Sequence, residues 1–321
     1  MGNTDLLYSL LQNIYNKHLN DTSGEVAQYI PELAMADPDP FAIAIATVNK
    51  DIVTIGDVDK RFSIQSISKP FVFGMALELF GPEKVYAHVG TEPSGEAFNS
   101  IELDPVRQRP FNPMINSGAI AMSSLIHDRF KTSADQELQS FFSQLAHSKL
   151  KIDEDVYRSE LNTAYRNRAL GYLMQGAGVI KSDVEEKIAL YTRQCSISVN
   201  TKELAIMAST LANFGTNPFS DSTIFSSLTV RNILSVMFTC GMYDYAGRWA
   251  VDVGLPAKSG VSGGVMAVVN RQIGIGIFSP RLDKIGNSVR AINACIDLAE
   301  ELGLHAFEIT NKGSSMLDIY I

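Results

Sequence analysis

The chain has 321 residues, of which 45% are apolar, so it can bury a substantial core as one large domain or two ordinary ones. Its formal net charge of −8 argues against a nucleic-acid-binding groove, which needs a basic stripe. No apolar run is long enough to cross a bilayer, and the first residues lack the pattern of a signal peptide.

The spacing of the cysteines indicates the redox compartment, and the spacing of the histidines limits the cofactors that the sequence predicts. Cys195, Cys240 and Cys295 are odd in number and widely spaced, which is typical of free thiols in a reducing compartment. The five histidines have no metal-binding spacing, and no glycine-rich phosphate loop is present. We therefore expect a soluble, cytoplasmic protein without a metal site, a nucleic-acid partner or a membrane partner.

In chain order, hydrophobic periodicity predicts a helix over about residues 6–15, a loop over 24–40 and a hairpin formed by 41–48 and 52–55. Isoleucine alternates with alanine in the hairpin, and the alanine face would let a helix pack closely. Helices dominate from residue 66 onward until two further strands appear at 256–269 and 272–278. An amphipathic helix over 287–302 follows them.

Strands thus lie near both ends of the chain, with a helical block between them and without alternating βαβ units. We predict an α+β fold in which both hairpins form one antiparallel sheet, flanked by the terminal helices, beside a helical lobe. The sheet lobe would comprise about residues 1–65 and 250–310, and the helical lobe about 66–249. Together they would form one domain over residues 1–310, followed by a tail over 311–321.

One short motif indicates nucleophilic chemistry. Ser66-Ile-Ser-Lys69 precedes an apolar run over 70–80 that is typical of a buried helix. Residues three apart face each other at a helix start, and a lysine whose charge is disfavoured by burial can take the serine proton. The pattern recurs at Ser148-Lys-Leu-Lys151, but no apolar helix follows, so we interpret that copy as surface.

A second lysine strengthens the interpretation of Ser66. Lys258-Ser-Gly260 lies on a late strand that would flank Ser66 in the predicted sheet. A Ser-x-x-Lys helix beside a Lys-Thr-Gly-like strand is the arrangement of penicillin-binding proteins and class A β-lactamases. We therefore expect a β-lactamase/transpeptidase-like fold, with Ser66 at the junction of sheet and helical lobe, a common place for a pocket.

Further sequence blocks extend over most of the chain: Tyr29-Ile-Pro-Glu-Leu33, Ser63-Ile-Gln-Ser-Ile-Ser-Lys69, Asn112-Pro-Met-Ile-Asn-Ser-Gly-Ala119, Arg166-Asn-Arg-Ala169, Gln194-Cys-Ser-Ile197, Met242-Tyr-Asp-Tyr245 and Pro256-Ala-Lys-Ser-Gly-Val-Ser-Gly-Gly264. In residue identity and order these blocks closely resemble the serine-dependent glutaminase family. This family includes bacterial enzymes and the catalytic domain of the vertebrate kidney and liver enzymes. The chain departs from the family at Ser117, where alanine is expected.

The resemblance implies an amidohydrolase that converts L-glutamine to L-glutamate and ammonia without a cofactor, and it implies a homo-oligomer, expected to be a tetramer. It implies that Ser66 is the nucleophile and Lys69 its base. The other implied roles are an oxyanion hole from the N–H groups of Ser66 and Val261, hydroxyls of Tyr243 and Tyr29 near the reacting centre, support from Lys258, and a substrate clamp of Asn116, Glu160, Asn167 and Tyr191.

These residue types suit a free amino acid. Glu160 can pair with its ammonium, and amides and tyrosine hydroxyls can donate to its carboxylate, so neither charge is buried alone. Residues 153–174 are predicted to be helical around a break. Glu160 and Asn167 are seven residues apart, close to two helical turns, so one helix face could present both.

Two other functions use the same features. A penicillin-binding protein, β-lactamase or related esterase would use the same Ser–Lys pair, but the chain has no Ser-Asp-Asn motif and no predicted signal peptide. A ligand sensor would keep the fold and bind glutamine without turnover, but Ser66, Lys69 and Lys258 are all present.

Overall fold

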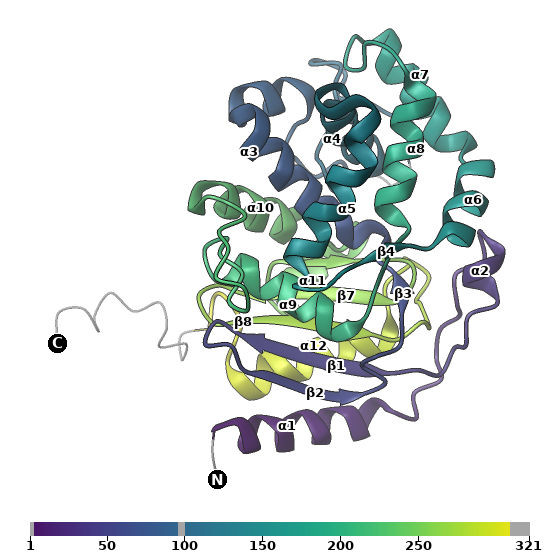
Figure 1. Ribbon diagram of the computed structural model, residues 1–321. Helices are drawn as coiled ribbons and strands as arrows, with labels where there is room; N and C mark the ends of the chain where they lie inside the picture. Colours follow the sequence, from purple (N-terminus) through teal and green to yellow (C-terminus); the bar gives the residue numbers. More distant parts are fainter. Residues whose placement is uncertain (1–2, 96–99, 309–321) are drawn as a thin grey trace, which may run out of the picture.

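The computed structural model describes residues 3–95 and 100–308, so the tail predicted over 311–321 lies outside the described residues. Its central element is a five-stranded antiparallel sheet in the order β2-β1-β8-β7-β6 (Figure 1). The strands are β1 (Ala42–Thr47), β2 (Ile52–Gly56), β6 (Ala257–Ser259), β7 (Gly264–Val269) and β8 (Ile273–Phe278). The predicted α+β fold, with one sheet built from both ends of the chain, is confirmed.

The sheet register brings small residues together on one face. Ala44 pairs with Gly276 and Ala46 pairs with Gly274. This face packs against α9 (Thr201–Ala212), and a Cβ on Gly274 would lie 2.1 Å from the backbone nitrogen of Ser209. Because helix backbone occupies that space, a larger residue cannot fit there. The alanine face therefore allows a close helix approach, as the alternation predicts.

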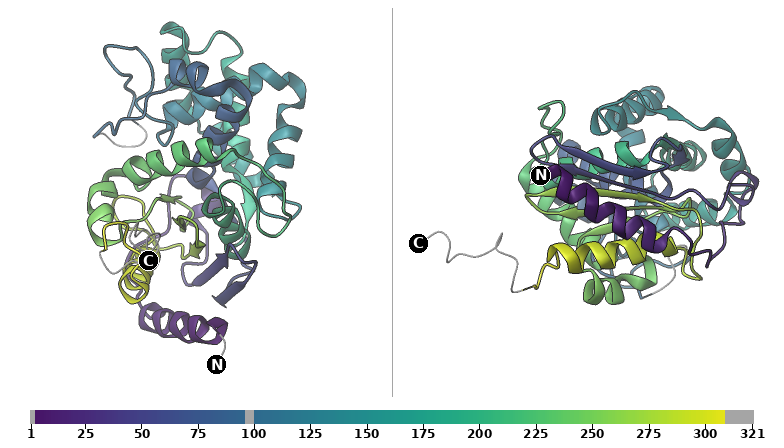
Figure 2. Two further views of the ribbon diagram at one scale, coloured as in Figure 1. Left: turned by 90° about the vertical axis from the view of Figure 1, so that its left-hand side faces the viewer. Right: turned by 90° about the horizontal axis from the view of Figure 1, so that it is seen from below.

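The other face of the sheet is covered by the first and last described helices. α1 (Asn3–His18) and α12 (Val289–Leu302) contact each other and the sheet, and Figure 2 shows them side by side. Their apolar side chains pack with Ile43 and Ile45 of β1 in one buried cluster. The terminal helices thus flank the sheet as predicted, whereas its second face is covered by α9, from the middle of the chain.

The remaining helices form a block on the α9 side of the sheet, above it in Figure 1. They include α3 (Lys69–His88), α4 (Asn116–Phe130), α5 (Ala134–Leu145), α6 (Glu154–Asn162), α7 (Tyr165–Gly176), α8 (Val184–Cys195) and α10 (Ser227–Cys240). Shorter elements are α2 (Pro31–Ala34), η1 (Gln65–Ser68), η2 (Lys131–Ser133), η3 (Tyr243–Tyr245) and α11 (Ala246–Asp252). In the described part of the chain, no helix has both the length and the apolar composition that a bilayer crossing requires.

Local structure differs from the sequence prediction at three places. The strand predicted over 256–269 is divided into β6 and β7, because Gly263, with φ of +104°, closes a turn in which its N–H donates to the Gly260 carbonyl. The predicted loop over 24–40 contains α2. A second sheet, in the order β3-β5-β4, was not predicted; its strands are β3 (Phe62–Ser63), β4 (Lys151–Ile152) and β5 (Ile197–Val199).

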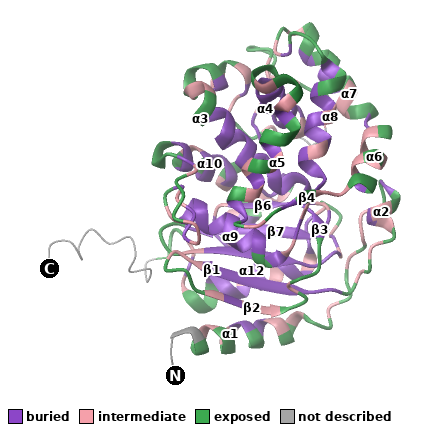
Figure 3. Cartoon of the chain, in the orientation of Figure 1, coloured by how far each residue is buried: buried purple, intermediate pink, exposed green. Residues whose placement is uncertain are grey.

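The largest cluster of buried apolar side chains extends from the sheet into the helical block. It joins Met266 and Phe278 of the sheet to Phe71 of α3 and Phe142 of α5. The ring of Phe62, on β3, stacks on Phe278 with 4.1 Å between the ring centroids. Figure 3 shows buried residues running continuously from the sheet into the helices. The segment that carries Ser66 directly follows β3, at this junction.

Candidate active site

Ser66 lies in η1, a short 3-10 helix that leads directly into α3. The sequence placed Ser66 at the start of the α-helix itself; the α-helix instead begins at Lys69, and Pro70 occupies its first turn. Gln65, just before Ser66, has φ of +52°, in the left-handed region. That conformation costs a residue with a side chain about 1 kcal/mol or more. A strained turn therefore presents Ser66 to the cavity described next.

Ser66 lines a cavity of about 420 Å³ between η1 and helices of the helical block. Seven of the residues predicted from the sequence to be catalytic or substrate-binding line this cavity: Tyr29, Ser66, Asn116, Glu160, Asn167, Tyr191 and Val261. They come from seven separate segments of the chain, with Tyr29 just before α2 and Val261 in the turn between β6 and β7. The structure thus brings together residues that are far apart in sequence.

Lys69 is buried at the first position of α3. Its Nζ donates to the side-chain oxygen of Asn116 at 2.7 Å and to the carbonyl of Met114 at 3.3 Å. Burial lowers the pKa of Lys69 to about 8, although the negative charge of Glu160 acts in the opposite direction. About a tenth of the Lys69 side chains are therefore uncharged at pH 7, and about half at pH 8.

Tyr243 and Lys258 form a buried pair beside Ser66. The Tyr243 hydroxyl donates to the Ser259 carbonyl at 3.0 Å and also makes a hydrogen bond with the Ser66 side chain. Lys258 lies on β6, where its Nζ donates to the carbonyls of Gly241 and Ser259 and sits 4.2 Å from the centroid of the Tyr243 ring. Burial raises the pKa of Tyr243, and burial together with the Lys69 charge lowers the pKa of Lys258.

One wall of the cavity carries a carboxylate held by two donors. Glu160 Oε1 accepts from Gln65 Nε2 at 2.6 Å and from the Tyr29 hydroxyl at 3.1 Å. Burial raises the pKa of Glu160, and these two hydrogen bonds oppose that rise. The carboxylate is thus fixed in place beside Ser66, where it can receive a cationic group.

A second set of lining side chains consists of amides and a phenol. Asn116 Oδ1 accepts from the Tyr191 hydroxyl at 3.2 Å as well as from Lys69, and Asn116 Nδ2 donates to Asn167 Oδ1 at 3.1 Å. Because Asn116 occupies the first position of α4, its backbone N–H is also at a helix N-terminus. These groups form one connected polar network that reaches Lys69.

Two features of the cavity differ from the sequence analysis. Glu160 lies on α6 and Asn167 on α7, with the predicted break at Thr163 and Ala164, so the two side chains are not presented by one helix face, as their spacing allowed. Gln65 and Cys195 also line the cavity but were not predicted. The sequence signal that could have identified Gln65 is its position as the polar residue directly before the predicted nucleophile, Ser66.

Cys195 follows Tyr191 by one turn of α8. It is a free, buried thiol, and burial raises its pKa to about 12, so it stays protonated at neutral pH. A possible metal-binding group elsewhere in the described residues, His127, Asp183 and Glu186, brings its ligand atoms within 4.8 Å of one another. None of these three residues lines the cavity at Ser66.

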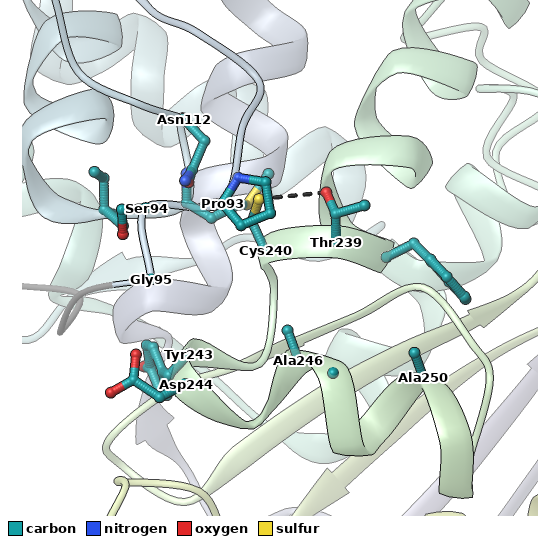
Figure 4. Close-up of a pocket in the computed structure, with 14 residues that line it drawn as sticks. Pro93, Ser94, Gly95, Asn112, Thr239, Cys240, Tyr243, Asp244, Ala246 and Ala250 are labelled. Atoms are coloured by element: carbon teal, nitrogen blue, oxygen red, sulfur yellow. Dashed lines mark hydrogen bonds between the residues drawn. The ribbon is translucent and has the colours of Figure 1, made fainter. Parts of the chain in front are cut away.

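A second cavity, of about 480 Å³, borders Tyr243 (Figure 4). Its lining includes Asn112, Asp244 and Cys240, and the hydrogen bond between Thr239 and Cys240 is visible in the figure. Tyr243 therefore both touches Ser66 and lines this second space. The charged residues predicted from the sequence to act in the site, Lys69, Lys258 and Glu160, do not line this second cavity.

An antiparallel sheet made from both ends of the chain, with a helical block on one face and a Ser-x-x-Lys turn at their junction, defines the β-lactamase-like class of α+β proteins. The chain matches the family model described as Glutaminase over residues 24–307. It is similar to a glutaminase of Trichormus variabilis, with 48% identity over 302 residues that cover 94% of this chain and 90% of the relative. A glutaminase of Nostoc sp. is 46% identical over 308 residues, which cover 96% of this chain and 92% of the relative.

Solved structures agree with the sequence relatives. The structure of a probable glutaminase, ybaS, has a TM-score of 0.90 at 37% identity and covers 96% of this chain and 99% of its own. The crystal structure of Mglu in its glutamate form has a TM-score of 0.88 at 42% identity, with 95% of this chain and 69% of that chain covered. The chain belongs to the glutaminase family.

Proposed function

We propose that this protein hydrolyses the side-chain amide of L-glutamine to L-glutamate and ammonia through an acyl-enzyme on Ser66. The observation that carries the mechanism is Lys69: a buried lysine with a pKa lowered to about 8, one helical turn from a serine that lines a polar cavity. Family membership supports the reaction, and one similar structure, Mglu, is described in a glutamate form.

In the acylation step, the Ser66 oxygen attacks the amide carbon of the substrate and its proton passes to the neutral Lys69 amine. A neutral amine has two N–H groups, which match the acceptors Asn116 Oδ1 and Met114 carbonyl, while its lone pair takes the proton. Collapse of the tetrahedral intermediate breaks the carbon–nitrogen bond. The leaving nitrogen takes a proton from the Lys69–Tyr243 pair and departs as ammonia.

In the deacylation step, water attacks the ester carbon and gives a proton to Lys69. The carbon–oxygen bond to Ser66 breaks, Ser66 regains a proton, and glutamate leaves. Tyr243 suits the proton relay because its hydroxyl makes a hydrogen bond with Ser66. Its raised pKa keeps the phenol protonated.

The oxyanion that forms in both steps needs fixed donors. We assign the backbone N–H groups of Ser66 and Val261 to this role. Within the described residues, neither N–H donates to another backbone carbonyl, and both residues line the cavity. Fixed donors of this kind stabilise a developing charge without reorganisation.

The charged ends of the substrate would be held by the two sets of polar side chains that line the cavity. Glu160 would pair with the α-ammonium, and its fixed orientation by Gln65 and Tyr29 lowers the entropic cost of that pairing. The amides of Asn116 and Asn167 would donate to the α-carboxylate, and the Tyr191 hydroxyl would turn from Asn116 Oδ1 to donate to it as well. This arrangement requires a free amino acid rather than a peptide, because both α-groups are engaged.

The test is ammonia release from L-glutamine by the wild-type protein and two serine variants. Ser66→Ala should lose activity by at least about a thousandfold, because no nucleophile remains. Ser148→Ala, in the second copy of the motif, is the matched control and should stay within about twofold of wild type. An active Ser66→Ala protein would refute the mechanism, and labelling of Ser66 by a fluorescent penicillin without ammonia release would favour the alternative, β-lactamase-like hydrolase.

We also propose a cytoplasmic location and a homo-oligomer, with a tetramer as the family expectation. The free state of Cys195, Cys240 and Cys295 supports a reducing compartment. Light scattering coupled to size exclusion would measure the mass of the assembly, and a monomeric mass would contradict the second proposal.

A further inference from the structure

A chain of three hydrogen bonds runs through the buried interior behind Ser66. The Ser123 hydroxyl, on α4, donates to Gln194 Oε1 at 2.9 Å. Gln194 Nε2, on α8, donates to the Ser68 hydroxyl at 2.9 Å, and Ser68 Oγ donates to the Gln65 carbonyl at 2.7 Å. All three side chains are buried. This Ser123–Gln194–Ser68 relay has no role in the mechanism described above.

The direction of these bonds follows from the acceptor at the end of the relay. A carbonyl can only accept a hydrogen bond, so the Ser68 hydroxyl must donate its one proton to the Gln65 carbonyl. The Ser68 oxygen then accepts from the Gln194 amide nitrogen, which turns the amide oxygen of Gln194 toward Ser123. Each link therefore fixes the next, and none of the three side chains can reverse without losing a buried hydrogen bond.

The last acceptor is part of the peptide that joins Gln65 to Ser66. In a planar trans peptide, the carbonyl and the N–H point in opposite directions. A relay that holds the Gln65 carbonyl toward the interior therefore holds the Ser66 N–H in the opposite direction. The same peptide follows a residue with φ of +52°, a conformation that needs support from its surroundings.

We propose that Ser123, Gln194 and Ser68 are positioning residues that aim the Ser66 N–H at the oxyanion. This inference rests on the proposed function, because it assumes that the Ser66 N–H is an oxyanion donor. The three side chains touch no substrate; they act on the rate through the orientation of one peptide group. Loss of the relay should therefore impair stabilisation of the tetrahedral intermediate and leave ground-state binding intact.

The test compares Gln194→Met, which keeps the length of the side chain, and Ser123→Ala, which removes only the outermost link. For Gln194→Met we expect kcat to fall about tenfold to a hundredfold, because removal of a whole oxyanion donor costs about 100- to 1000-fold. Ser123→Ala should give a smaller loss of the same kind. The KM for glutamine and the Kd for L-glutamate should stay within about threefold of wild type.

Each variant has a control on the same helix. Thr192→Val removes a buried hydroxyl of α8 that donates to the Ile188 carbonyl of its own helix, and Ser124→Ala does the same on α4, where the acceptor is Ile120. Both should keep wild-type kcat. A boronic-acid analogue of glutamine, whose tetrahedral oxygen occupies the oxyanion position, should lose affinity for Gln194→Met in proportion to the loss of kcat/KM.

The outcomes separate the two proposals. If wild type releases no ammonia, the proposed function fails, and the relay is then judged by the rate at which a p-nitrophenyl ester acylates Ser66 in wild type and Gln194→Met. If wild type is active, full kcat in Gln194→Met overturns the relay. A parallel loss of kcat and of L-glutamate affinity, shared by Thr192→Val, would also overturn it, because it would indicate a general loss of structure.

Discussion

At the scale of single residues, one physical cause acts on all the titratable groups around Ser66. Removal from water disfavours the charged form of a side chain, so it lowers the pKa of the buried Lys69 and Lys258 and raises that of Tyr243. For Lys69 and Tyr243, the cost of burying a charge favours the neutral amine and the neutral phenol. Lys69 becomes a base at accessible pH, while Tyr243 remains an acid.

The lowered pKa of Lys69 predicts the pH dependence of the reaction. Below about pH 8 the amine of the free enzyme binds a proton and can no longer take one from Ser66, so kcat/KM should fall about tenfold per pH unit on the acid side. Above that pH the fall should cease. Ammonia release at glutamine concentrations well below KM, measured from about pH 6 to about pH 9, checks this, and a flat profile over that range would contradict Lys69 as the base.

A lysine at the second copy of the motif controls for general effects of charge. Lys151 is exposed on β4, so Lys151→Met should leave the fall in activity at low pH unchanged. Lys69→Met should remove activity across the whole range, because the hydrogen bonds to Asn116 and Met114 disappear together with the base.

At the scale of elements, the start of α4 is where packing and chemistry meet. Gly118 lies in the first turn of α4, against the segment that presents Met114 and Asn116 to Lys69. A Cβ at Gly118 would lie 1.9 Å from the carbonyl oxygen of Asn112. That atom belongs to the backbone, so it cannot rotate away, and helix and segment must separate.

Gly118→Ala should therefore lower both stability and activity. We expect a loss of about 1–3 kcal/mol in the free energy of unfolding, the usual cost of overpacking, measured in urea. The glutamine KM should rise and kcat should fall, because Asn116 moves. Gly176→Ala, where the structure leaves open space, is the control and should be neutral or slightly stabilising, since alanine favours a helix. Normal kinetics in Gly118→Ala would refute the steric argument.

Elements with strong periodicity could be predicted from sequence, and the relations among them could not. The alternation in β1 and the apolar run of α3 each carry a local signal, and both were found. The division of β6 from β7 depends on the turn at Gly263, which interrupts an otherwise continuous strand pattern. The placement of Glu160 and Asn167 on separate helices depends on the position of the break within residues 153–174, which the spacing of seven residues does not indicate.

The cavity was predictable to the extent that each residue carries a motif of its own. Ser66 and Lys69 lie within one helical turn, so local spacing was sufficient to pair them. The relay through Ser123 and Gln194 joins α4 to α8 and ends on a backbone carbonyl. No local pattern marks such a connection, because serine and glutamine are usually exposed and only the folded chain buries them together.

At the scale of the whole molecule, the sheet and the helical block share a core. The buried cluster that contains Phe71 and Phe142 of the helices also contains Met266 and Phe278 of the sheet. The cavity at Ser66 lies at the same junction, with lining residues from both sides. Separation of the two lobes would expose this shared apolar surface and dismantle the cavity in the same event.

The shared core predicts a single unfolding transition for the proposed domain over residues 1–310. The sequence has one tryptophan, Trp249 of α11, which is buried with Leu11 and Val265 in the cluster on the α1–α12 side of the sheet. Its fluorescence therefore reports on the sheet, whereas the far-ultraviolet circular dichroism is dominated by the helices. In urea, the two curves should have the same midpoint, and saturating L-glutamate should shift both equally, because the ligand binds only when the junction is intact. Two displaced transitions, with only one of them sensitive to L-glutamate, would mean that the lobes unfold separately.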